Sequence, residues 1–322
     1  MTLEAYYRHE GEAIDYTPSS ALTGGQVIQL ADGRAAVAIT DMAAGAKGAV
    51  GVVGVYRLEK TTSMVILDGG RVYWDHSANK AHYKKVNDRD FYVGRAVGDA
   101  SSSATTVDVA INIDPPADID VLRDAALSVA TGTAAAGGFG LPGVYGGARG
   151  LLLTATSQVQ CVDILSVDRF AVGANAIVEA IFRVGVNGST SDVDFNIGVA
   201  NGTSTSDADA VTEHCYVHID GGALDIYAQS KDGTTTVAAV DTTINATAGS
   251  AVSDRIEVWF DLRDPSDIQI YINGANVLPA TVFRLDAATG PLGLLAHLEK
   301  ANGTATAGPI YIDRLCCRLM EQ

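Results

Sequence analysis

The histidines are the first residues whose spacing could support chemistry. His214 and His218 are four residues apart, a spacing that lets two imidazoles share one metal ion when the segment is helical. The surrounding residues alternate as in a β-strand, where this separation spans ~13 Å, so the two side chains cannot chelate one ion. His76 and His82 flank a polar, turn-like stretch, and we expect both to be solvated or hydrogen-bonding surface groups.

The four cysteines indicate neither a disulfide framework nor a zinc site. Cys161 and Cys215 lie in apolar, strand-like surroundings, whereas Cys316 and Cys317 are adjacent. Neighbours in a strand point to opposite faces of the sheet, so Cys316 and Cys317 are poorly placed to share a metal ion. We expect all four to be buried thiols that behave as small hydrophobic side chains.

Two acidic stretches raise the question of calcium. Residues 191–196 and 201–209 combine Ser, Asn and Asp, and the second includes Asp207 and Asp209. Neither stretch follows the D-x-[DN]-x-[DN]-G pattern of a calcium loop, so we favour solvated turns and keep calcium as the alternative. The nucleophile motif G-x-S-x-G is absent as well. The sequence therefore assigns no catalytic, cofactor-binding or metal-ligating residue.

Four aromatic residues could stack on sugar rings. They are Tyr216, Tyr227, Trp259 and Tyr271. Each lies within an alternating apolar strand pattern, which predicts that they pack in the core instead.

The charge balance limits the partners. In 322 residues there are 22 Lys and Arg against 38 Asp and Glu, a net charge of −16. Such a surface repels phosphate backbones and anionic membranes, so we expect no nucleic-acid and no membrane partner. No apolar stretch reaches the ~18 residues of a spanning helix. The first residues lack the features of a signal peptide, and we expect a soluble protein made without export.

The local patterns predict an all-β chain in two domains. Short β-branched runs separated by Gly, Asn, Asp and Ser indicate a compact, barrel-like β-domain over residues 1–113. Glycines within residues 50–55 suggest bulges or close backbone approach. From residue 150 to residue 322 the strands are longer, and turns such as Asn273-Gly274 favour an antiparallel sandwich.

Residues 114–149 are predicted to link the two domains. Asp114-Pro115-Pro116 ends the first domain, since proline removes backbone donors. Residues 117–130 have apolar side chains at helical spacing and predict a short helix. Residues 131–147 are rich in Gly and Ala and predict an extended linker.

Several runs within residues 1–113 resemble a known family in order and spacing. They include residues 9–18 (HEGEAIDYTP), 24–28 (GGQVI), 51–56 (GVVGVY), 70–75 (GRVYWD) and 92–96 (YVGRA). Together they resemble the tailed-phage capsid cement, or decoration, family, once catalogued as a domain of unknown function. The resemblance implies a small β-barrel on the outer face of a viral head, which reinforces contacts between major capsid proteins and forms trimers.

Residues 150–322 resemble a concanavalin-A-like (laminin-G-like) jelly roll. The resemblance rests on residues 258–262 (VWFDL), 270–274 (IYING), 290–294 (GPLGL) and 310–314 (IYIDR). It implies a fold and carries no function by itself. Jelly-roll glucanases use an E-x-D-x-x-E run, which is absent here. The nearest pair, Glu257 and Asp261, is better explained as the polar half of an alternating strand.

The sequence therefore predicts a structural virion protein without enzymatic activity or cofactor. Residues 1–113 would bind the major capsid protein on the outer capsid surface as a homotrimer, after synthesis in the host cytoplasm. Residues 150–322 would project outward, and their binding of surface glycans is a further hypothesis without site residues. The alternatives are a carbohydrate-binding adhesin or fibre component not bound to the head and, with less support, a hydrolase.

Overall fold

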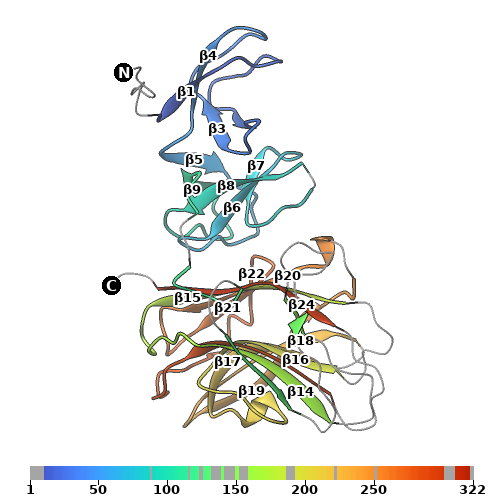
Figure 1. Ribbon diagram of the computed structural model, residues 1–322. Helices are drawn as coiled ribbons and strands as arrows, with labels where there is room; N and C mark the ends of the chain where they lie inside the picture. The colour runs from blue at the N-terminus through green and yellow to red at the C-terminus, as the bar shows by residue number, and fades with distance from the viewer. Residues whose placement is uncertain are drawn as a thin grey trace, which may run out of the picture. The chain divides into compact units, whose positions relative to one another are not determined.

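The computed structural model describes residues 11–87, 89–114, 117–122, 126–131, 139–140, 149–151, 159–185, 193–220, 223–249, 252–300 and 309–319. The chain divides into two compact units, residues 1–116 (unit 1) and 117–322 (unit 2) (Figure 1). The described residues form β-strands and two short 3-10 helices, without an α-helix. None of these helices is long and apolar enough to span a membrane.

Unit 1 consists of two small antiparallel sheets. The first has the order β1-β4-β3-β2 and the second β5-β9-β8-β6-β7. The first contains β1 (Ala13–Tyr16), β2 (Val27–Gln29), β3 (Ala35–Ala38) and β4 (Gly48–Gly51). The second contains β5 (Val55–Glu59), β6 (Arg71–Asp75), β7 (Lys80–His82), β8 (Phe91–Ala96) and β9 (Thr106–Ile111).

The barrel-like arrangement expected for unit 1 is therefore a pair of sheets. The run from residue 48 to residue 56 is divided between them, because the chain turns at Gly54, whose φ is +120°. Gly51 ends β4, and a Cβ at this position would collide with the hydroxyl of Tyr56. The close backbone approach expected of these glycines is thus confirmed at Gly51.

Asn112 links the two sheets of unit 1. It follows β9 with a φ of +58°, a left-handed conformation that asparagine tolerates. Its side-chain oxygen accepts a hydrogen bond from the backbone N–H of Ala35 (2.8 Å), and its amide donates to the carbonyls of Ala35 (2.9 Å) and Val52 (2.8 Å). One side chain that follows the second sheet thereby satisfies three backbone groups at the ends of β3 and β4, the two inner strands of the first sheet.

Unit 2 is a sandwich of two larger antiparallel sheets, seen as stacked layers in Figure 1. One sheet has the order β12-β13-β24-β15-β20-β21-β22, with β10 also paired to β24. Its strands are β10 (Ile119–Asp120), β12 (Phe139–Gly140), β13 (Arg149–Leu151), β15 (Ala176–Val184), β20 (Ile256–Leu262), β21 (Gln269–Ile272), β22 (Ala275–Val277) and β24 (Ile310–Leu319).

The other sheet has seven strands in the order β11-β14-β23-β16-β17-β18-β19. They are β11 (Ala126–Thr131), β14 (Gln160–Ser166), β16 (Val193–Ala200), β17 (Glu213–Asp220), β18 (Asp225–Asp232), β19 (Thr236–Asn245) and β23 (Gly293–Lys300). The 3-10 helices η1 (Ala208–Ala210) and η2 (Val252–Asp254) lie between strands. One continuous apolar core, containing Phe182, Phe195, Phe260 and Phe283, lies between the sheets.

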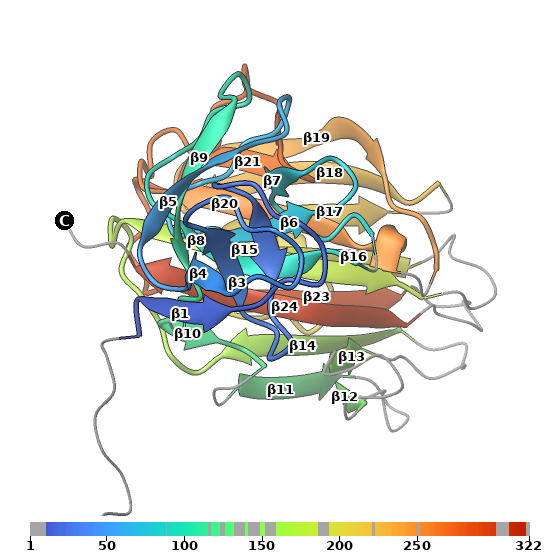
Figure 2. The ribbon, with the colours of Figure 1, turned by 90° about the horizontal axis from the view of Figure 1, so that it is seen from above.

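The short helix expected over residues 117–130 is wrong. Residues 119–120 form β10 and residues 126–131 form β11, each at the side of a longer strand. Figure 2 shows β11 beside β14. Pairing with β24 and β14 satisfies the backbone groups of this segment, and it overrides the weak helical spacing of its apolar residues. Of the linker expected to follow, residues 132–138 and 141–148 lie outside the described residues, whereas β12 and β13 join the sheet of β24.

The Asn112→Ala substitution tests the link between the sheets of unit 1. We expect it to lower the free energy of unfolding of unit 1 by about 2–4 kcal/mol, because three buried backbone groups lose their partner. Urea unfolding of the full chain can be followed through Trp74 in a Trp259→Phe background, since the chain has 2 tryptophans.

Asn79→Ala is the matched control. Asn79 also has a positive φ, of +53°, but its side chain is exposed, so we expect a loss of about 1 kcal/mol or less. Equal losses in the two variants would show that the backbone conformation, and not the hydrogen bonds, is what Asn112 contributes.

Candidate functional site

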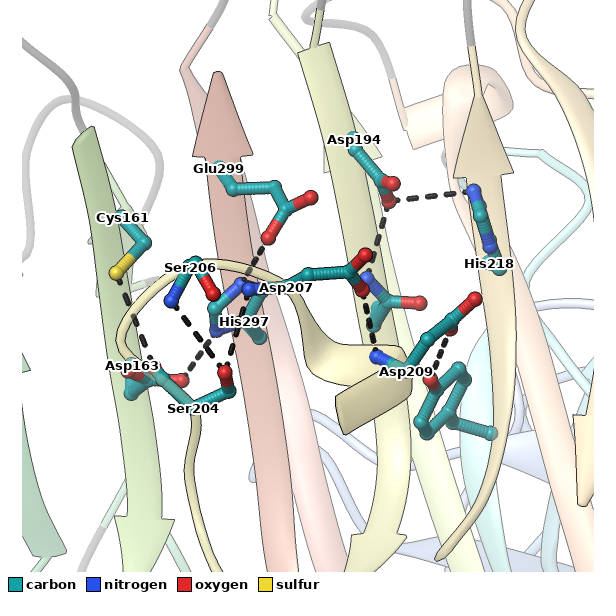
Figure 3. A network of polar contacts seen from close by, with 12 residues as sticks. Cys161, Asp163, Asp194, Ser204, Ser206, Asp207, Asp209, His218, His297 and Glu299 are labelled. Atoms are coloured by element: carbon teal, nitrogen blue, oxygen red, sulfur yellow. Dashed lines mark hydrogen bonds and ion pairs between the residues drawn. The ribbon is translucent and has the colours of Figure 1, made fainter. Parts of the chain in front are cut away.

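The outward face of the seven-stranded sheet of unit 2 carries a row of polar side chains. Residues alternate between the core and this face, so that Val162, for example, enters the core and its neighbour points outward. The strand register aligns Asp163, His297, Asn196 and His218 on four adjacent strands, β14, β23, β16 and β17. Figure 3 shows the side chains of Asp163, His297 and His218 on one face of the sheet.

His297 lies between two carboxylates. Its Nδ1 is 2.5 Å from Asp163 Oδ1 and its Nε2 is 2.7 Å from Glu299 Oε2. The side chains of His297 and Asp163 are both fully buried. Burial by itself would lower the pKa of His297, but the hydrogen bonds to Asp163 and Glu299 outweigh it and raise the pKa to about 9. At neutral pH the ring is therefore a buried imidazolium that donates to both carboxylates.

A loop of residues 201–212 packs on the same face. Val211 contacts Leu165, Ala200 and Leu295, which form a small apolar cluster outside the main core. The Ser204 carbonyl accepts a weak hydrogen bond from the Cys161 thiol (3.8 Å). These contacts fasten the loop to β14, β16 and β23.

Two aspartates shape the end of this loop. Asp207 is the N-cap of η1, and its carboxylate accepts a hydrogen bond from the N–H of Asp209 (2.7 Å). The Asp209 carboxylate accepts hydrogen bonds from the Tyr216 hydroxyl (2.6 Å) and the Gln229 amide. Burial would raise the pKa of Asp209, but the hydrogen bonds from Tyr216 and Gln229 outweigh it and lower the pKa.

Four buried atoms of the polar row lack a hydrogen-bond partner in the described part of the chain. They are Asp163 Oδ2, Asn196 Oδ1 and both ring nitrogens of His218, of which Nε2 lies 3.2 Å from Asp194 Oδ1. Asp163 is 0% and Asn196 1% exposed. Buried polar atoms are normally satisfied, and the two oxygens of these four atoms accept only. A group that donates hydrogen bonds, such as a hydroxyl or a water molecule, would complete them.

The aromatic residues expected in the core are buried in two cases. Tyr216 is 0% and Trp259 4% exposed, as expected, whereas Tyr227 and Tyr271 are half-buried, so the prediction is wrong for these two. Each of the four stands between two residues of the main core, and alternation places all four on the outward faces of the sheets. Tyr216 lies under the loop, where it donates to Asp209.

The remaining histidines have separate environments. His214 Nδ1 lies 3.0 Å from the Val211 carbonyl, and burial lowers the pKa of His214 to about 4. His218 Nε2 lies 3.2 Å from Asp194 Oδ1. His82, expected at the surface, is buried at the end of β7, and burial lowers its pKa to about 4. His76 is exposed as expected.

The cysteines follow the sequence prediction. All four are free and buried, and burial raises the pKa of the Cys316 thiol to about 11. Cys317 belongs to the main core, whereas Cys316 lies on the opposite face beside Glu179.

The two acidic stretches are only partly described. Residues 191–192 lie outside the described residues, and Asp207 and Asp209 are engaged in the loop contacts above. Within the described ranges no group of three His, Cys, Asp or Glu side chains could hold a metal ion.

The outward face of the other sheet is also polar. Glu257 accepts a hydrogen bond from Trp259 Nε1 (2.7 Å), and Asp261 pairs with Arg263 (2.6 Å). The interpretation of Glu257 and Asp261 as the polar half of an alternating strand is thus confirmed. The polar row on the seven-stranded sheet was missed, because Asp163 and His297 are 134 residues apart and only the strand order brings them together.

Unit 1 contains a groove that sequence reasoning also missed. Two adjoining cavities of about 480 and 440 Å³ share Gln26, Val27 and Asn79 in their lining. Residues of β2 from the first sheet and of β5 and β6 from the second line the larger cavity. His76 and Arg89 line the smaller one. The groove therefore follows the junction between the two sheets.

The buried charge of His297 predicts a pH dependence of stability. The pKa of His297 rises from 6.5 to about 9 on folding, so its stabilising contribution is complete below pH 6.5 and is lost as the pH rises through about 9. We expect the free energy of unfolding of unit 2 to fall by roughly 2–3 kcal/mol between pH 6.5 and pH 10. Urea unfolding followed through Trp259 measures this, and the His297→Gln variant should lack this fall. A wild-type stability that stays constant over the same range would contradict the assignment.

Comparison with known proteins gives one sequence family and several distant folds. Residues 8–111 match the family model described as phage cement protein. No curated protein matches the chain. Among solved structures, the Emp47p carbohydrate recognition domain is 11% identical, with a TM-score of 0.41, over 63% of this chain and 94% of that one. The carbohydrate-binding module CBM66 of Bacillus subtilis is 7% identical, with a TM-score of 0.36, over 59% and 94%.

The family match includes every strand of unit 1, since β1 begins at residue 13 and β9 ends at residue 111. The runs that carried the resemblance in the sequence extend from residue 9 to residue 112 and agree with this match to within one residue. Unit 1 is therefore a domain of the phage cement protein family, followed in the same chain by a β-sandwich.

Proposed function

We propose that this chain is a capsid cement protein of a tailed phage. Unit 1 binds the outer surface of the head and stabilises contacts between major capsid proteins, and unit 2 projects away from the lattice. The observation that carries the proposal is the family match over residues 8–111. The action is binding, without a catalytic step or a cofactor.

The distribution of charge supports this division of roles. Unit 1 contains 11 Lys and Arg against 14 Asp and Glu, a net charge of −3, whereas unit 2 contains 11 against 24, a net charge of −13. A nearly neutral unit can approach a protein lattice without long-range repulsion, and strongly acidic outer units keep the free protein soluble.

Many identical weak contacts are sufficient for such a role. A homotrimer of unit 1 would bind several capsid subunits at once, and the second and third contacts would form at a high effective concentration. The protein would be synthesised in the host cytoplasm and added to the outer capsid surface there.

Copy number tests the cement function. We expect quantitative mass spectrometry of purified source-virus particles to find this chain in numbers comparable to the major capsid protein. The purified full chain should also saturate particles that lack it. A handful of copies per particle would contradict the proposal and favour an adhesin or a fibre component.

A second function is supported by the polar row of unit 2. We propose that this face binds neutral glycans. Asp194, His218 and Tyr227 are partly exposed on this face, so they offer to a sugar a carboxylate that accepts hydrogen bonds from hydroxyls, an imidazole and an aromatic ring. Asp163 and Asn196 lie buried beside them and do not reach the ligand themselves. The surrounding carboxylates disfavour anionic sugars.

Binding of the full chain to a glycan array tests this second function. We expect a neutral glycan to bind the wild-type chain and His218→Ala to bind it about tenfold more weakly, ~1.4 kcal/mol. Thr236→Ala, at an exposed position in β19 of the same sheet, should bind as the wild type does. No bound neutral glycan, or equal binding by both variants, would contradict the proposal.

A further inference from the structure

The basic residues of unit 1 fall into two groups. Most described ones have partners: Arg34 pairs with Asp32, Lys47 with Asp15, Arg57 with Asp108, and Arg71 and Arg95 with Asp114. The buried Lys60 donates to the carbonyls of Thr61 and Met64. The side chains of Lys80, Lys85 and Arg89 form no hydrogen bond or ion pair with the described residues. All three lie within ten residues of one another.

Lys84 adds a fourth positive charge to this segment. Its ammonium lies 5.5 Å from the centre of the Tyr83 ring, which stacks on His82. A cation–π contact leaves the charge in place. Lys85 and Arg89 are exposed, and Lys80 and Lys84 are half-buried. The described residues 76–87, 89 and 90, which we call the basic loop, therefore form a locally positive segment of an acidic protein, since residues 76–90 contain four Lys and Arg against two Asp.

The basic loop is held in shape by two aspartates. Asp90 is buried, and its carboxylate accepts hydrogen bonds from the N–H groups of His76 (2.9 Å), Val86 (2.7 Å) and Asn87 (2.8 Å). At the other end, Asp75 accepts from the N–H and hydroxyl of Ser77. The carboxylates of Asp75 and Asp90 therefore hold the described part of the loop in shape, and among the described residues they form no ion pair with Lys80, Lys85 or Arg89.

The groove of unit 1 adjoins this loop. His76, Asn79 and Arg89 belong to the loop and line the cavity of about 440 Å³, together with Phe91 and Tyr16. The cationic surface thus continues into a concave site with aromatic walls. This shape suits a projecting segment of polypeptide that carries acidic side chains.

We infer that the basic loop and the adjoining groove are the surface by which unit 1 binds an acidic segment of the major capsid protein. This inference rests on the proposed cement function and names the contact that performs it. A free nucleic acid is disfavoured, because both units have a net negative charge and repel a continuous phosphate backbone at long range. A short acidic segment of polypeptide, in contrast, is small enough to interact mainly with the cations of the basic loop.

Charge reversal tests the inference in the full chain. We expect Lys85→Glu/Arg89→Glu to bind particles lacking the protein at least about tenfold more weakly than the wild type. Arg34→Glu/Lys47→Glu is the matched control, since it makes the same charge change at exposed, paired positions of the same unit. The control should bind within about twofold of the wild type.

A salt titration of the unmodified chain gives a second readout that does not depend on folding of a variant. We expect its affinity for the particles to fall several-fold between 50 and 300 mM NaCl, because screening weakens exposed charge contacts. Salt-independent binding, or equal binding by the two double variants, would overturn the inference and leave the cement function standing. If the charge reversal weakens binding to heparin but not to particles, the inference is also overturned. Failure of the wild-type chain to bind particles would overturn the cement function itself.

Discussion

Alternation of side chains along antiparallel strands is the constraint on which unit 2 depends. Each strand that sends Val, Ile, Leu or Phe into the core must direct its other residues outward. On the seven-stranded sheet these residues include Asp163, His297 and Asn196, which a loop then covers. A polar layer is thereby buried outside an apolar core. Its groups must satisfy one another, because buried charge without a partner is costly.

The contacts of His297 satisfy most of the buried polar groups of this layer. One imidazolium between two carboxylates leaves a single net negative charge in the cluster, and the loop adds the bonds of Asp209 with Tyr216 and Gln229. The atoms that remain unsatisfied are concentrated in the same row. The paired groups therefore fix the loop on this face, and the partly exposed side chains of Asp194, His218 and Tyr227 lie on the same face of the sheet.

Unit 1 is under a different constraint. Its two sheets consist of strands of three to six residues and enclose only small apolar cores. At the junction of the sheets the side-chain amide of Asn112 forms hydrogen bonds with backbone groups of Ala35 and Val52. The same junction forms the groove beside the basic loop. The other basic residues in the described part of unit 1 have acidic or carbonyl partners, so the side chains of Lys80, Lys85 and Arg89 are a local exception and not a general surplus of positive charge.

The sequence by itself was enough to predict the fold class, the placement of two cysteines and the family that unit 1 resembles. Period-two alternation with Gly and Asn turns was enough to predict an all-β chain, and adjacent positions placed Cys316 and Cys317 on opposite faces. The runs within residues 9–96 were enough to recognise the cement family, because they follow one another along a single continuous domain.

The tertiary structure decided what depends on contacts between distant segments. Backbone pairing with β24 and β14 turned an expected helix at residues 117–130 into strands. The phase of alternation placed Tyr227 and Tyr271, which were expected in the core, half-buried on the outward faces of the sheets. Strand order joined Asp163 to His297 across 134 residues. A local pattern specifies which side chains alternate, but which face is buried, and which strand lies next to it, are set by the free energy of the whole packed sheet.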